Sequence, residues 1–215
     1  MKMNAYDSSL LYDAQTRLAW MLDFAVNVYN VELNNFYHMF LRNAISDRMA
    51  VGDMSVVLGK SGRELAYLIL KDNGYEGDMI RADRYLERSE EYWTGDYLAY
   101  FQWETSLGYK EIQDFCDICE IREMYSPYHE MDVSKFCTHM SELYLERNID
   151  SRLKKMRKLS GISQKMLSER TGIPLKTIQQ YEQRQKNINH ARVDYLIAIS
   201  RELSCEVEAL VEKIQ

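Results

Sequence analysis

Basic side chains are concentrated in one stretch of the chain, between residues 147 and 190. This stretch has eleven Lys and Arg residues but only three Asp and Glu residues, a local net charge of +8. Clustered cations suit a polyanion such as the phosphate backbone of a nucleic acid. A solvated basic face is the other interpretation, and charge alone favours it. The basic residues are Arg147, Arg152, Lys154, Lys155, Arg157, Lys158, Lys165, Arg170, Lys176, Arg184 and Lys186.

The rest of the chain has the opposite charge. Residues 1–146 contain 13 Lys and Arg residues against 25 Asp and Glu residues, whereas residues 147–215 contain 14 against 8. The formal net charge of −6 therefore combines −12 in the first part with +6 in the second. This change of charge predicts two domains, 1–146 and 147–215, with different partners.

Few residues in the chain can break a helix. Only 2 prolines and 9 glycines occur in 215 residues, fewer than the turns of a β-sandwich or barrel require. A hydrophobic content of 46% with 28% charged residues excludes a disordered or collagen-like chain. We therefore expect an all-α protein.

No segment has the pattern of a membrane span or a secretory signal. The apolar residues 18–28 are interrupted by Asp23 and Asn27, and no basic start or cleavage site accompanies them. We therefore expect no membrane association and a cytoplasmic protein, in which the four cysteines remain reduced.

Apolar residues at three- and four-residue steps predict a bundle of amphipathic helices in the first domain. Ser61 and Glu64 have the spacing of a capping box. Residues 75–88 lack periodicity and are interpreted as a connector. We expect the last helix to continue toward Arg152 and to join the two domains. The predicted helices span residues 12–29, 33–44, 61–73, 89–106, 109–123 and 133–148.

Residues 89–106 form the most aromatic segment of the chain. A helix that is apolar nearly all round is typical of the buried centre of a bundle, and an aromatic cleft for a ligand or peptide is the alternative. We expect the helix to bury Trp93, Tyr97 and Phe101. We expect Tyr92 and Trp103 to contact a partner protein or a second subunit, because aromatic side chains are preferred anchors of interfaces.

Cys116 and Cys119, with Cys137, His139 and His129 further along, have half of a zinc-binding pattern. A zinc knuckle places its CxxC pair in a turn, whereas this pair lies in a predicted helix, where thiols pack as small apolar groups. We therefore expect no metal site. The sequence also lacks a phosphate-binding glycine loop and a metalloprotease signature. We expect no catalytic residues, no cofactor and no enzyme activity.

The basic stretch contains the signals of two short helices joined by a tight turn. Ser163 is placed to cap a helix that Gly172 ends, and Pro174 suits the first turn of the next helix. Such a pair is a helix-turn-helix unit. Apolar faces predict one helix before this unit and two after it, over residues 193–203 and 207–211, giving a domain of five helices.

Residues 152–211 resemble the Xre family, the helix-turn-helix domains of phage repressors and Cro-like regulators. The resemblance implies that Arg157 pairs with the acidic residue after the recognition helix, Glu182. Two positions depart from the family pattern, because Pro174 replaces a Ser or Thr cap and Arg184 replaces a frequent glycine. The residues that match the family are Ser163, Gln164, Leu167, Gly172, Ile173, Ile178 and Glu182.

The third helix of this domain is the expected DNA-reading element. A helix in the major groove presents its N-terminal and outward side chains to base edges, and neighbouring polar groups hold phosphates. Gln pairs with adenine, Lys reaches guanine, and Leu or the Thr methyl meets a thymine methyl. The expected base-reading residues are Leu175, Lys176, Thr177, Gln179 and Gln180. The resemblance implies phosphate contacts from Gln164, Lys165, Arg184, Lys186 and Asn187.

These patterns predict a sequence-specific transcriptional regulator, acting as a repressor and binding double-stranded DNA as a homodimer. Its first domain is then a sensor of a small-molecule effector or a protein-binding domain. The alternative is an antitoxin, because some bacterial antitoxins resemble this arrangement, with a C-terminal helix-turn-helix after an acidic domain. In that case residues 1–146 bind a toxin protein and the second domain represses the protein's own operon.

Overall fold

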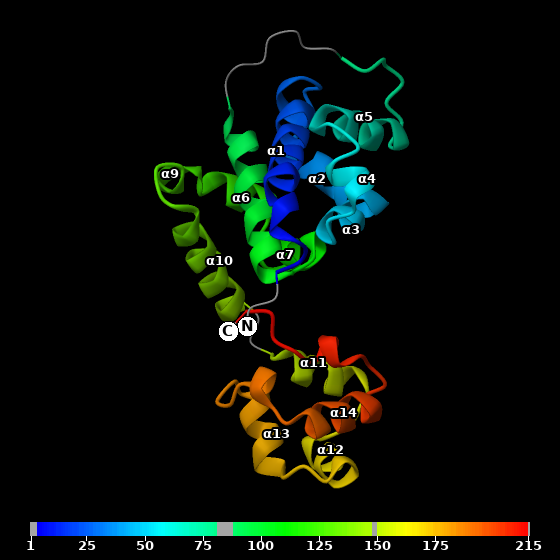
Figure 1. Cartoon of the computed structure of the whole chain (residues 1–215), viewed down its shortest axis with the longest axis vertical. Helices are drawn as coiled ribbons and strands as arrows, with labels where there is room; N and C mark the ends of the chain where they lie inside the picture. Colours follow the sequence, from blue (N-terminus) through cyan, green and yellow to red (C-terminus); the bar gives the residue numbers. More distant parts are fainter. Residues whose placement is uncertain (1–3, 81–87, 148–149, 215) are drawn as a thin grey trace. The chain divides into compact units, whose positions relative to one another are not determined.

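The computed structural model describes residues 4–80, 88–147 and 150–214, and all the regular elements in these ranges are helices (Figure 1). The all-α prediction is therefore confirmed. The chain divides into two compact units, Met1–Leu143 and Tyr144–Gln215. The boundary expected from charge, between residues 146 and 147, lies three residues later, within the last turn of α10. No helix in the described ranges is both long enough and apolar enough to span a membrane.

The N-terminal unit is assembled from helices that follow one another closely along the chain. They are η1 (Ser8–Leu10), α1 (Leu11–Asn27), α2 (Leu33–Arg42), α3 (Ala44–Ala50), α4 (Met54–Val57), α5 (Gly62–Asp72), α6 (Glu90–Thr105), α7 (Tyr109–Phe115), α8 (Ile118–Glu123), α9 (Tyr125–Tyr128) and α10 (Val133–Arg147).

Helices α1 and α6 share the most extensive contact of this unit and lie side by side (Figure 1). Gly95 in α6 permits the close approach. A Cβ atom at this position would lie 2.6 Å from the Ala19 Cα and 2.7 Å from the Leu18 carbonyl oxygen of α1. Because both of these are backbone atoms, no side-chain rotation could make room for a methyl group.

Side-chain caps begin two helices that periodicity did not predict as separate elements. Helix α3 follows the predicted helix 33–44, and α8 lies within the predicted helix 109–123. Asn43 separates α2 from α3, and its carboxamide oxygen accepts a hydrogen bond from the Ile45 amide at 3.0 Å. Asp117 begins α8 in the same way, with 2.8 Å to the Cys119 amide. The capping box of Ser61 and Glu64 is confirmed at the start of α5.

The connection between the units also differs from the expectation of one continuous helix. Helix α10 ends at Arg147, and Ser151 caps a new helix that begins at Arg152. Of the expected connector, Tyr75–Ile80 contains no helix, and residues 81–87 lie outside the described residues.

The aromatic helix α6 is only partly as expected. Trp93 and Phe101 are buried, as predicted, but Tyr97 is half-buried. Tyr92 is 6% exposed and packs edge-on against Trp20, with ring centroids 4.8 Å apart. This burial argues against the expected partner contact of Tyr92, because its ring already packs in the α1–α6 contact.

Trp103 remains half-buried and holds the N-terminal segment of its own chain. Its indole Nε1 donates a hydrogen bond to the Tyr6 carbonyl at 2.9 Å, and the Ala5 amide donates to the Trp103 carbonyl at 2.9 Å. Part of the surface expected to meet a partner is thus used within the chain.

The cysteines of the CxxC pair lie at a helix junction. Cys116 follows the last residue of α7 and is buried, Cys119 lies in α8, and Cys137 is buried in α10. Within residues 4–80, 88–147 and 150–214, no three His, Cys, Asp or Glu side chains are grouped so as to hold a metal ion.

The C-terminal unit packs its helices around an apolar core that includes Leu153, Leu167, Ile178 and Ile199. The expected fifth helix is a short 3-10 turn, although Leu210 after it is buried, so the apolar pattern identified the packing but not the helix type. The elements are α11 (Arg152–Leu159), α12 (Gln164–Thr171), α13 (Leu175–Glu182), η2 (Ile188–His190), α14 (Val193–Glu202) and η3 (Val207–Ala209).

We predict that Gly95→Ala lowers the free energy of unfolding of the N-terminal unit by about 3 kcal/mol, because α1 and α6 must move apart. Hydrogen–deuterium exchange of the α1 amides measures this change. Gly108→Ala is the control, since its new Cβ would meet nothing closer than 3.7 Å, and it should cost less than about 1 kcal/mol. Equal exchange in the two variants would contradict the packing argument.

Candidate nucleic-acid interface

The turn between α12 and α13 is built from local hydrogen bonds and one glycine. The Ser163 hydroxyl accepts from the Met166 amide at 3.1 Å and begins α12, and Gly172 ends it with φ +71°, a conformation that favours glycine. The Ser168 hydroxyl donates to the Ile173 carbonyl at 2.6 Å across the turn. Pro174 is the N-cap of α13 rather than a first-turn residue, and no side chain caps the helix there.

A buried ion pair joins three helices of the unit. The Glu182 carboxylate at the end of α13 is 3% exposed, and both its oxygens accept from the Arg157 guanidinium of α11, at 2.6 and 2.9 Å. Arg157 also donates to the Ile162 carbonyl at 2.8 Å. Gln164 of α12 donates to the same carboxylate at 2.8 Å. The orientation of α13 is thereby coupled to both preceding helices, as the resemblance implied for Arg157 and Glu182.

The residues expected to read bases lie on the sides of α13 that the core does not cover. Ile178 and Tyr181 are buried in the core of the unit. The other side chains of the helix carry methyl groups, an ammonium group, a hydroxyl group and two carboxamides. These groups match the donors, acceptors and methyl groups at base edges. These exposed or half-buried residues are Leu175, Lys176, Thr177, Gln179 and Gln180.

Three of the expected phosphate-contact residues flank α13 in different ways. The Lys165 side chain is 78% exposed, and its Nζ lies 3.9 Å from the Glu169 carboxylate. A surface ion pair of this length contributes little to the free energy of folding. Lys186 is exposed, with its Nζ 5.6 Å from the ring centroid of Tyr181. The Asn187 side chain accepts from the Asn189 amide at 2.8 Å and so caps η2.

Arg184 and Gln164, two further expected phosphate contacts, form hydrogen bonds inside the unit. Arg184 has φ +55°, at the position where the family often has glycine. Its guanidinium donates to the Asp150 carbonyl at 3.3 Å and lies 3.8 Å from the Glu212 carboxylate. In this conformation Arg184 is directed toward these acceptors rather than outward, and the Gln164 amide is held by Glu182.

Several basic residues of the stretch are neutralised by carboxylates of the same unit. Asp150 accepts from Lys154 at 2.6 Å and from Lys158 at 2.5 Å, and these bonds lower the pKa of its carboxyl group to about 2. Arg170 pairs with Glu202 at 2.7 Å. Asp150 is already subtracted in the sequence count of +8, but Glu202 lies outside residues 147–190, so the Arg170 pair makes that count an overestimate of the charge offered to a polyanion. The four-residue spacing of Asp150 and Lys154 was a sequence signal for that pair, whereas the spacing of Asp150 and Lys158 was not.

We predict that Arg157→Met lowers the free energy of unfolding of the C-terminal unit by about 3 to 5 kcal/mol, because it leaves a buried carboxylate without its cation. Hydrogen–deuterium exchange of the α13 amides reports this loss. The double variant Arg157→Met/Glu182→Leu should recover part of it, since no charge is then buried.

The control for this prediction is Arg192→Met, which removes an ion pair with Asp194 whose side chains are 71% and 57% exposed. Such a pair contributes less than about 1 kcal/mol. If Arg157→Met and Arg192→Met had equal effects, the buried pair would not be what holds α13.

A family model described as Helix-turn-helix matches residues 153–210, a little over a quarter of the chain. No curated protein and no solved structure matches the chain. The matched residues begin in α11 and end just after η3, so they include the turn, the buried ion pair and the exposed face of α13. Residues 153–210 are therefore a helix-turn-helix domain of the Xre type.

Proposed function

We propose that the protein is a sequence-specific transcriptional regulator that binds double-stranded DNA through α13 and acts as a repressor. The observation that carries this proposal is the helix-turn-helix domain, in which α13 is fixed by a buried ion pair and turns polar side chains away from the core. The proposed role is binding rather than catalysis, and it places the protein in the cytoplasm with its DNA.

Lysines at the exposed face of the domain support the phosphate contacts that this role requires. Lys165 lies in the first turn of α12, Lys176 in the first turn of α13, and Lys186 shortly after α13. Among the described residues, no carboxylate pairs with Lys176 or Lys186. Positive charge at these places favours phosphates on either side of a groove that receives α13.

The short recognition helix supports binding as a homodimer. Helix α13 spans eight residues and can reach only a few base pairs. Two copies related by a two-fold axis would read two half-sites about 34 Å apart, one helical turn of DNA, and so double the sequence information.

The N-terminal unit supports a role as a sensor or as a protein-binding domain, and one surface feature favours the antitoxin alternative. Three large apolar side chains near α4 are exposed. Val51 follows α3, Met54 begins α4 and Leu58 follows α4, and these residues are 67%, 63% and 43% exposed. Neighbouring exposed apolar side chains are typical of protein interfaces.

An antitoxin should copurify with a small protein from its native host, and Met54→Asp should release that protein. A sensor should purify alone.

We predict that Gln179→Ala and Gln180→Ala each weaken binding to the preferred operator by about 1 to 3 kcal/mol and relax base preference at one position. Selection of binding sites from randomised DNA, followed by titration of the selected duplex, measures both effects. If both variants retain the wild-type preference, α13 is not the element that reads the sequence.

Lysine variants provide the matched contrast to these glutamine variants. Lys165→Ala and Lys186→Ala should weaken binding to all duplexes alike and reduce the slope of log affinity against log salt by about one each, because phosphate contacts release counterions without reading bases. Lys110→Ala, an exposed lysine of the N-terminal unit, should leave affinity and slope unchanged.

A further inference from the structure

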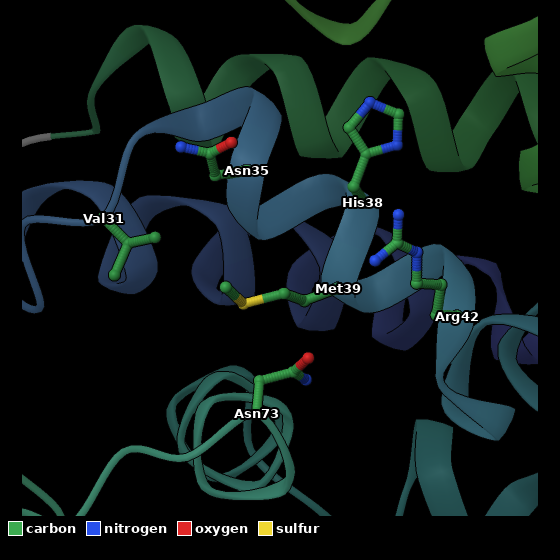
Figure 2. A pocket seen from close by; sticks show the side chains of 6 residues that line it. All are labelled: Val31, Asn35, His38, Met39, Arg42 and Asn73. Carbon is green, nitrogen blue, oxygen red and sulfur yellow. The ribbon is translucent and has the colours of Figure 1, made fainter.

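A hollow lies on the N-terminal unit between one face of α2 and the end of α5 (Figure 2). Its volume is about 400 Å³, within the range of small-molecule sites. Helix α2 supplies most of the lining from positions 35, 38, 39 and 42, which share one helical face. The lining residues are Val31, Asn35, His38, Met39, Arg42 and Asn73.

The lining is unusual for this unit because it contains no carboxylate. The sequence up to residue 146 has 25 acidic residues against 13 basic ones, yet the hollow presents a guanidinium, an imidazole and two carboxamides. Within the described ranges, no carboxylate lies within ion-pair distance of Arg42. Two acidic residues adjoin the lining in sequence. Asp72 accepts a hydrogen bond from Asn43 at 2.9 Å, and Glu32 caps α2 by accepting from the backbone amides of Asn34 and Asn35.

The polar and apolar groups of the hollow lie on different parts of its wall. Figure 2 shows the His38 ring and the Arg42 guanidinium at the same end of α2, while the Met39 side chain extends toward the side where Val31 lies. Met39 and Val31 are half-buried and offer an apolar surface. The side-chain Nδ2 of Asn73 donates to the Ile69 carbonyl at 2.8 Å, which fixes this side of the hollow.

The position of Arg42 in the last turn of α2 has a simple explanation, since a cation there interacts favourably with the helix dipole. That explanation does not account for a hollow beside the arginine, or for an imidazole and two carboxamides around it. Together these groups form a cationic donor set next to an apolar wall, which matches a ligand with an anionic head and an apolar body.

We propose that this hollow binds a small organic anion. Arg42 and His38 hold the carboxylate or phosphate head, Asn35 adds a carboxamide, and the apolar body of the ligand packs on Met39 and Val31. The inference does not depend on DNA binding, because every residue that it uses belongs to the N-terminal unit.

The test uses the full-length ¹⁵N-labelled protein and three probes of similar size, benzoate, phenyl phosphate and the neutral benzyl alcohol. Nuclear magnetic resonance follows the side-chain amide signals of Asn35 and Asn73 during each titration. Both anions should shift these signals at millimolar concentration, and benzyl alcohol should not. A head group preference between the two anions then identifies the ligand class.

Variants of exposed arginines give the matched controls. Arg42→Gln should weaken binding of the anions about tenfold, and Arg42→Lys should weaken it less, because it retains the charge but loses the planar fork. Arg63→Gln removes an exposed arginine of the same unit, one that lies 5.7 Å from the ring centroid of Phe24, and should bind as wild type.

Several outcomes would overturn the proposal. These are the absence of any shift with both anions, an equal response to benzyl alcohol, or unchanged affinity in Arg42→Gln. Equal weakening by Arg63→Gln would show that general charge, rather than this hollow, attracts the probes. Since Arg42 is exposed, its variants should fold, and wild-type amide spectra away from the hollow would establish that they do.

Discussion

The buried contact between Arg157 and Glu182 is the interaction on which the helix-turn-helix domain depends. A carboxylate that is 3% exposed would be costly without partners, but two parallel hydrogen bonds from a guanidinium and a third from Gln164 satisfy it. Helices of eight residues are marginal by themselves in water. Three such helices therefore take their mutual orientation from one charged cluster as well as from the apolar core.

The N-terminal unit depends on close packing between α1 and α6. Gly95 lets α1 and α6 approach so closely that their backbones meet, and the aromatic rings of α6 then fill the space on either side. The two units thus respond to different perturbations. An added methyl group at Gly95 disturbs the α1–α6 contact, and loss of the Arg157 charge disturbs the cluster that orients α13.

Local signals in the sequence predicted most of the helices, because caps act over three or four residues. Ser61, Ser163 and Gly172 were recognised in this way, and so was the helix-turn-helix unit. The burial and direction of long side chains could not be predicted, since they depend on partners distant in sequence. Tyr92 is buried by Trp20, and Arg184 is turned toward Glu212, 28 residues further along the chain. Periodicity likewise continues across Asn43 and Asp117, whose side chains begin new helices.

The aromatic packing of the N-terminal unit has an optical consequence. All three tryptophans of the chain, Trp20, Trp93 and Trp103, lie in this unit, and the C-terminal unit contains none. Selectively excited indole fluorescence therefore reports on the N-terminal unit alone, because the helix-turn-helix domain contributes no indole emission. Trp103 in addition donates to the Tyr6 carbonyl, so its emission reports whether the segment around Tyr6 stays in contact with α6. The N-terminal unit can thus be followed separately from the C-terminal unit without an added label.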